Sequence, residues 1–73
     1  MRANREYRLL RKRGGLLPSR ERVDQVEIVE IASGETVLLW DVPSESVRTL
    51  LRELRADLAQ LEGPAFLARW RDR

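Results

Sequence analysis

The 73-residue chain contains neither cysteine nor histidine. Without cysteine it has no disulfide and no thiolate, and without histidine it lacks the commonest catalytic base and the usual nitrogen ligand of zinc. The two absences exclude Ser-His-Asp and Cys-His nucleophile systems and pH switching by histidine. We therefore expect no catalytic residue, no metal and no cofactor, and the sequence implies no small-molecule substrate.

Carboxylates of the central region are the remaining candidates for acid–base chemistry or a hard-metal site. No partner base, glycine-rich phosphate loop or metal-ligand motif accompanies them. We interpret the group as a solvated acidic surface and predict that the protein is not an enzyme. The four residues are Glu27, Glu30, Glu35 and Asp41.

Long hydrophobic runs are also absent. No stretch approaches the roughly 18–20 apolar residues that span a bilayer. The basic N-terminus runs into Arg11-Lys12-Arg13 instead of the apolar core of a signal peptide. This pattern predicts a cytoplasmic protein without membrane contact.

The length of the chain allows one small domain. For this mass, apolar burial contributes on the order of 100 kcal/mol, and ordering the chain costs about as much. Since no disulfide adds stability, we expect the chain to form a homodimer, to dock on a protein partner, or to leave one end unfolded.

Charge is unevenly distributed, although the formal net charge is only +2. Residues 1–22 carry a net charge of +6, and residues 23–62 carry −6. We therefore divide the chain into a basic N-terminal arm with its connector, residues 1–22, and a small ββαα domain, residues 23–73. The asymmetry favours contact with a polyanion or an acidic protein. It equally fits an arm that lies on the acidic body of its own chain or of a second copy.

The arm itself allows two local structures. Residues 4–13 fit a short helix, and they fit an edge strand in which Tyr7 and Leu9 share a face. Gly14-Gly15 ends either structure, and residues 16–19 are typical of a connector because they contain a proline. The sequence leaves open whether the arm is helical, extended or disordered.

The clearest β signal lies in the middle of the chain. Two runs rich in β-branched side chains flank Ala32-Ser33-Gly34, which is typical of a three-residue hairpin loop with a bulge, closed by the glycine at positive φ. This register places Val26 opposite Trp40 and Ile28 opposite Leu38 on one face. A loop one residue shorter would slip the pairing and exchange the faces.

The opposite face of this hairpin is also partly apolar. One helix covers only one face of a two-stranded hairpin, so the second face requires a further layer or a second copy. We therefore predict a homodimer. The hypothetical self-association surface consists of Val29, Ile31, Val37 and Leu39.

The C-terminal half predicts two helices. Ser44 is expected to cap a long amphipathic helix over residues 44–62. Gly63-Pro64 then ends this helix and begins a short one that carries Phe66 and Trp70. The apolar stripe of the long helix consists of Val47, Leu51, Leu54, Leu58 and Leu61.

Three arginines, Arg48, Arg52 and Arg55, fall within an arc of about 60° beside this stripe. Glu53 and Asp57 fall on the opposite flank. Such a pattern suits a helix–helix interface in a homodimer, a phosphate-binding stripe, or an ordinary helix that packs on its own sheet.

The sequence therefore predicts an α+β fold: an antiparallel β-hairpin, a long amphipathic helix and a short C-terminal helix, preceded by a basic arm. We expect a non-catalytic interaction module, an accessory or regulatory protein that acts through protein contacts or self-association. The alternative is a nucleic-acid-binding protein. Its hypothetical binding residues, or those for an acidic partner, are Arg2, Arg5, Arg8, Arg11, Lys12, Arg13, Arg48, Arg52 and Arg55. The predicted core consists of Val26, Ile28, Leu38, Trp40, Val47, Leu51, Leu54, Leu58, Leu61 and Phe66.

Overall fold

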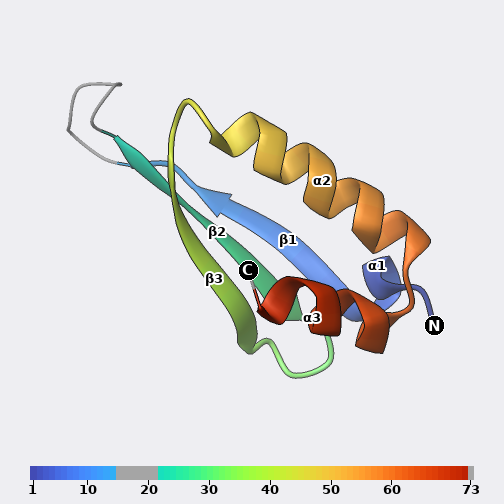
Figure 1. Ribbon diagram of the computed structural model, residues 1–73. Coiled ribbons are helices and arrows are strands. Elements are labelled where there is room, and N and C mark those ends of the chain that lie inside the picture. The colour runs from blue at the N-terminus through green and yellow to red at the C-terminus, as the bar shows by residue number, and fades with distance from the viewer. Residues whose placement is uncertain (15–21, 73) are drawn as a thin grey trace.

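The computed structural model describes residues 1–14 and 22–72 and has the predicted α+β architecture. A three-stranded antiparallel sheet, in the order β1-β2-β3, carries its two longer helices on one face (Figure 1). Among the described residues, no helix combines the length and apolar character that crossing a membrane requires. The connector predicted at residues 16–19 lies outside the described residues. The elements are α1 (Ala3–Glu6), β1 (Tyr7–Lys12), β2 (Val23–Glu30), β3 (Thr36–Pro43), α2 (Val47–Gln60) and α3 (Gly63–Arg71).

The N-terminal segment forms one helical turn and then the third strand of the sheet. β1 pairs antiparallel with β2, with Leu9 opposite Ile28. The strand interpretation of residues 4–13 is therefore confirmed for residues 7–12, whereas the helix interpretation is wrong beyond residue 6. Tyr7 and Leu9 share a face as the strand interpretation requires: Tyr7 is buried, and Leu9 packs against the core. β2 is consequently the central strand.

The hairpin between β2 and β3 has the predicted register in its middle. Val26 lies opposite Trp40, Ile28 lies opposite Leu38, and Gly34 has a φ of 76°. The expected three-residue loop is wrong, because the amide of Glu30 already pairs with the carbonyl of Glu35. The loop therefore spans residues 31–34. The register shifts by one residue between Ile28 and Val29, which places the bulge inside the sheet.

Ile31 explains part of this difference. Its amide donates to the Glu6 carbonyl at 2.9 Å instead of pairing across the hairpin. The end of β2 is thus held by the chain that precedes β1, an interaction between segments far apart in the sequence. The side chain of Ile31 lies in the loop, with 47% of its surface exposed.

The prediction that Ser44 caps α2 is also wrong. The Ser44 hydroxyl lies 3.1 Å from the Arg22 carbonyl and 2.9 Å from Oδ1 of Asp24. The helix begins at Val47, and its N-cap, Ser46, makes no side-chain capping bond. Ser44 is unavailable as a cap because it joins the approach to α2 to the start of β2.

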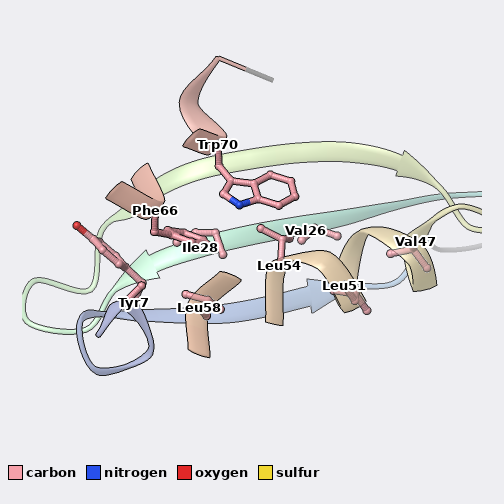
Figure 2. Close-up of a cluster of buried hydrophobic side chains, with 10 residues drawn as sticks. Tyr7, Val26, Ile28, Val47, Leu51, Leu54, Leu58, Phe66 and Trp70 are labelled. Atoms are coloured by element: carbon pink, nitrogen blue, oxygen red, sulfur yellow. The ribbon is translucent and has the colours of Figure 1, made fainter. Parts of the chain in front are cut away.

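The core lies between the sheet and the two longer helices (Figure 2). The apolar stripe of α2 is buried against its own sheet, which is the ordinary packing considered for this helix. Trp70 meets Trp40 edge to face, with ring centroids 5.7 Å apart, and Phe66 stacks on Tyr7. Leu38, Trp40 and Leu61 of the predicted core are partly buried and pack against it. The buried apolar residues are Ala3, Tyr7, Val26, Ile28, Val47, Leu51, Leu54, Leu58, Phe66 and Trp70.

Candidate functional site

Two surfaces of the molecule combine features that a binding partner could use. The first is the face of the sheet that points away from α2 and α3 (Figure 1), which we term the open face. Since side chains alternate along a strand, it contains the neighbours of the buried residues. Its members are Arg8, Leu10, Lys12, Val23, Gln25, Glu27, Val29, Thr36, Leu39, Asp41 and Pro43.

Cross-strand pairing arranges the open face in rows. One row contains Leu10, Glu27 and Leu39, and the next contains Lys12, Gln25 and Asp41. Leu39 is 53% exposed and Leu10 38%. The row of Gln25 therefore runs from a cation at the β1 edge to a carboxylate at the β3 edge, whereas the row of Glu27 has a leucine at each end.

Glu27 occupies the middle of the open face between two leucines. Its side chain is only 12% exposed. The Thr36 hydroxyl donates to Oε1 at 2.9 Å, and Nζ of Lys12 lies 3.4 Å from Oε2. Oε2 accepts no hydrogen bond from any described residue. This carboxylate is held by contacts within its own chain.

The predicted self-association residues occupy three environments. Val29 and Leu39 lie on the open face. Ile31 lies in the adjacent loop, and Val37, at the register shift, is half-buried and packs against the core. The apolar part of the open face is completed by Leu10 and Val23. Sequence reasoning missed Leu10 because it did not place β1 in the sheet.

The second surface is a cleft of about 410 Å³ where the end of β1 meets the start of α2. Three guanidinium groups, those of Arg11, Arg13 and Arg48, line it together with Glu45. We term it the arginine cleft. Its remaining lining residues are Ser44, Val47 and Thr49.

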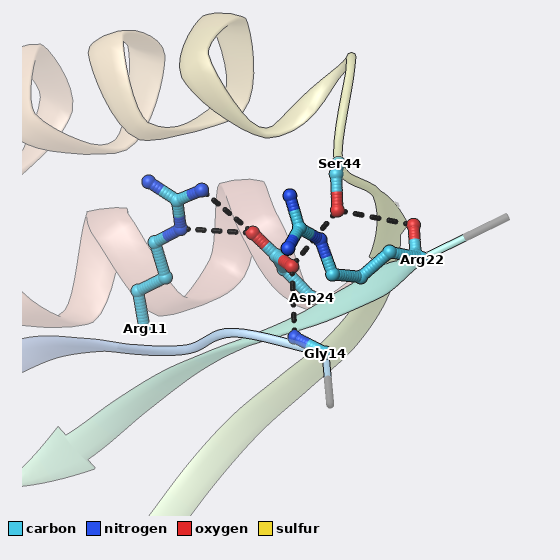
Figure 3. Close-up of polar contacts among 5 residues, drawn as sticks. All are labelled: Arg11, Gly14, Arg22, Asp24 and Ser44. Carbon is cyan, nitrogen blue, oxygen red and sulfur yellow. Dashed lines mark hydrogen bonds and ion pairs between the residues drawn. The ribbon is translucent and has the colours of Figure 1, made fainter. Parts of the chain in front are cut away.

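A buried carboxylate fixes one of these arginines (Figure 3). Asp24 is 1% exposed, and its Oδ2 accepts from Nε of Arg11 at 2.9 Å and from Nη2 at 2.7 Å. Oδ1 accepts from the Gly14 amide at 3.0 Å and from the Ser44 hydroxyl. The Gly14 amide, the Arg11 guanidinium and the Ser44 hydroxyl together lower the pKa of Asp24 to about 2, against the opposing effect of burial.

Sequence reasoning did not single out Asp24, although a signal was present. Asp24 stands two residues before Val26 and four before Ile28, so alternation places it on the covered face. A carboxylate in that position has to be paired and hydrogen-bonded. The missing information was its partner, because Arg11 reaches it only when β1 joins the sheet. Arg22 adds a further guanidinium beside it, and its buried Nε has no acceptor among the described residues.

The nine predicted cations do not form one patch. Arg8 and Lys12 lie on the open face, whereas Arg2 and Arg5 lie at the opposite end of the sheet from the arginine cleft, where Nη1 of Arg2 donates to the Gln60 carbonyl. The cleft itself contains three of the nine. The flank of α2 that begins at Arg48 continues with Arg52 and Arg55, both exposed. Alternation along β1 therefore points its cations to opposite sides of the sheet. Arg8 and Lys12 lie on the open face, and Arg11 lines the arginine cleft.

The opposite flank of α2 is occupied within the molecule. Oδ2 of Asp57 accepts from Nε1 of Trp70 at 2.8 Å and lies 3.3 Å from Nε of Arg69. Glu53 lines a small pocket between α2 and α3 together with these three residues. The acidic flank therefore serves helix packing, while the basic flank faces solvent.

Neither surface has the features of a metal site. Among residues 1–14 and 22–72, no three acidic side chains gather closely enough to hold a metal ion. Comparison of the chain with family models, curated proteins and solved structures finds no match. Function is therefore inferred from the chemistry of the open face and of the arginine cleft.

Proposed function

We propose that this protein is a non-catalytic interaction module, an accessory or regulatory protein, that acts by pairing with a second copy of itself through the open face. The observation that supports it is the order of side chains within the rows. When a row is reversed, its two ends complement each other: Lys12 meets Asp41 in one row, and Leu10 meets Leu39 in the next.

The reversal corresponds to one symmetry operation. The two-fold axis runs parallel to β2, between the open faces of two copies. It packs β1 of one copy against β3 of the second copy. Each row then faces the same row of the second copy in reverse order. Lys12 of one copy then faces Asp41 of the second copy, because the two residues belong to one row. Leu10 faces Leu39 for the same reason. Opposite charges therefore meet at one height along the strands and leucines meet at the next, while the two Glu27 side chains face each other across the axis.

The other in-plane axis is disfavoured by charge. A two-fold axis perpendicular to the strands lays β1 on β1 and brings Arg8 and Lys12 of both copies together. Like charges at such distances repel. The charge pattern therefore favours one axis and one relative orientation of the two sheets.

The size of the open face limits the expected affinity. Three strands spaced about 4.8 Å apart and about seven residues long offer roughly 350 Å² per copy in projection. A standard stable interface buries about 800 Å² per partner. We therefore expect dissociation constants in the micromolar range. The exposed Leu10 and Leu39 contribute about 1 kcal/mol each when covered.

A charge-exchange experiment tests the proposal. Asp41→Lys places a lysine opposite Lys12, and Lys12→Asp places an aspartate opposite Asp41, so each variant alone is expected to be monomeric. In an equimolar mixture the two variants present opposite charges to each other and are expected to form heterodimers. Sedimentation equilibrium of the separate and mixed proteins measures this.

Asp72→Lys is the matched control, since it makes the same charge change away from the open face. It is expected to dimerise like the parent protein. A parent protein that stays monomeric into the high micromolar range would overturn the proposal. So would unchanged dimerisation of the Asp41→Lys variant.

A further inference from the structure

We propose that the arginine cleft and the adjoining flank of α2 bind the sugar-phosphate backbone of a nucleic acid. The contacting residues would be Arg11 and Arg13 of the β1 end and Arg48, Arg52 and Arg55 of α2. This surface is separate from the open face, so the inference does not depend on the proposed self-association.

The first step concerns charge that the fold leaves unpaired. Within residues 1–14 and 22–72, no ion pair or side-chain hydrogen bond engages Arg13, Arg48, Arg52 or Arg55. In the described part of the chain, one carboxylate, Glu45, lines the cleft with them. The surface therefore keeps an excess of positive charge, in contrast to the acidic flank of the same helix.

The second step concerns Arg11, which is held in place. Its Nε and Nη2 donate to Asp24, and its side chain is still 33% exposed. Nη1 remains to donate to a ligand. Asp24 is 1% exposed and offers no oxygen to solvent, so it positions the guanidinium without facing the ligand. A preordered arginine loses less side-chain entropy on binding.

The third step concerns the shape of the charged surface. One α-helical residue rises about 1.5 Å, so the span from Arg48 to Arg55 covers about 10 Å along a single flank of α2. The cleft extends this line at its N-terminal end, where the positive end of the helix dipole adds to the potential. One DNA strand carries a phosphate per about 3.4 Å of helix axis. Because the strand also winds around this axis, successive phosphates lie about twice as far apart as the rise, so the flank faces about two phosphates and the cleft a third, whereas a single phosphate would use the cleft alone.

The composition of the cleft favours nucleic acid over an acidic protein. Protein–protein affinity is usually concentrated in a few large side chains, chiefly Trp, Tyr and Arg, that fill well-packed, desolvated pockets. Among the described residues that line the cleft, Val47 is the only apolar one. Backbone binding requires charge and hydrogen-bond donors and no such pocket.

Fluorescence anisotropy of labelled mixed-sequence duplex DNA, single-stranded DNA and RNA, between about 50 and about 200 mM salt, tests the inference. We expect binding to at least one of the three, with log K falling against log salt at a slope of about −3. The double variant Arg48→Gln, Arg52→Gln should flatten the slope by about 1.8 and weaken binding at low salt by about 10-fold to 100-fold. Both positions are exposed, and circular dichroism confirms that the variant stays folded.

The control is Arg5→Gln, Arg71→Gln, which removes the same charge from exposed positions outside the cleft. It should leave the slope unchanged. Equal losses in the two double variants would overturn the inference, because the effect would then reflect net charge. Absence of binding at about 50 mM salt would overturn it, as would binding of polyglutamate in preference to every nucleic acid.

Discussion

The two faces of the sheet are built from the same three strands, yet they are organised by different rules. On the covered face, Val26 and Ile28 are fully buried and meet the side chains of α2 and α3. On the open face, Leu10 and Leu39 flank Glu27, and charges of opposite sign occupy the two edges. A shift of one residue along a strand moves a side chain from one set to the other. Apolar volume therefore determines one face, whereas the pairing of unlike side chains organises the other.

The largest expected effect is the difference in unfolding free energy lost when a leucine is truncated on each face. Leu54, at the centre of α2, has no exposed surface, and Leu54→Ala is expected to cost about 2–5 kcal/mol through lost burial and the cavity left behind. Leu39→Ala, on the open face, is expected to cost less than about 0.5 kcal/mol in the monomer. Urea unfolding at low protein concentration measures both. Equal losses would show that the open face is covered in the folded monomer.

The next effect is the contribution of the buried Asp24 to the pH dependence of the unfolding free energy. Because the pKa of Asp24 is lowered from 3.8 to about 2, the folded state favours its carboxylate form. This contribution is fully present above pH 3.8 and is lost as the pH falls through about 2. The unfolding free energy of the parent protein should therefore decline over that interval. Asp24→Asn should remove this part of the decline.

Asp41→Asn provides the comparison from the open face. It removes a carboxylate that is exposed, and in the monomer it should leave the acid limb of the stability profile as in the parent protein. The same urea unfolding series, followed from neutral pH to about pH 2, checks both variants. A profile that Asp41→Asn flattens more than Asp24→Asn would contradict the role of the buried carboxylate.

The smallest effect tests the axis of the proposed dimer. The two-fold axis passes over β2 and brings Glu27 of the two copies close together. Glu27→Gln removes this repulsion and is expected to raise the dimer affinity by about 3-fold to 10-fold. Glu35→Gln makes the same chemical change in an exposed position outside the rows and should leave the affinity unchanged. Sedimentation equilibrium that shows weaker dimers of Glu27→Gln would place the axis elsewhere.

Local patterns were sufficient to predict much of the covered face. Alternation in β2 and β3 and the glycine at position 34 predicted the pairing of Val26 with Trp40, which is correct because the register shift between Ile28 and Val29 offsets the longer loop. The helical spacing of Val47, Leu51 and Leu54 identified the buried stripe of α2. These signals are readable because the period of a strand or helix is a property of neighbouring residues. The loop length was not readable in the same way, because the amide of Ile31 pairs with Glu6, far away in the sequence.

The candidate surfaces were less accessible to prediction. The basic segment fitted a helix and a strand about equally, and its choice of β2 as a neighbour determined both surfaces. That pairing adds Leu10 and Lys12 to the open face and brings Arg11 to Asp24. No periodicity within residues 1–14 specifies such a partner.

The sequence alone therefore determined the strands and helices that follow residue 22, the pairing in the middle of one hairpin and the exclusion of histidine and cysteine chemistry. These follow from composition and from interactions between near neighbours. The tertiary structure determined which side of the sheet each N-terminal cation occupies, the burial of Asp24 and the meeting of Arg48 with Arg13 in one cleft. The physical reason is that strand pairing and ion pairing join residues whose separation in sequence carries no local signal.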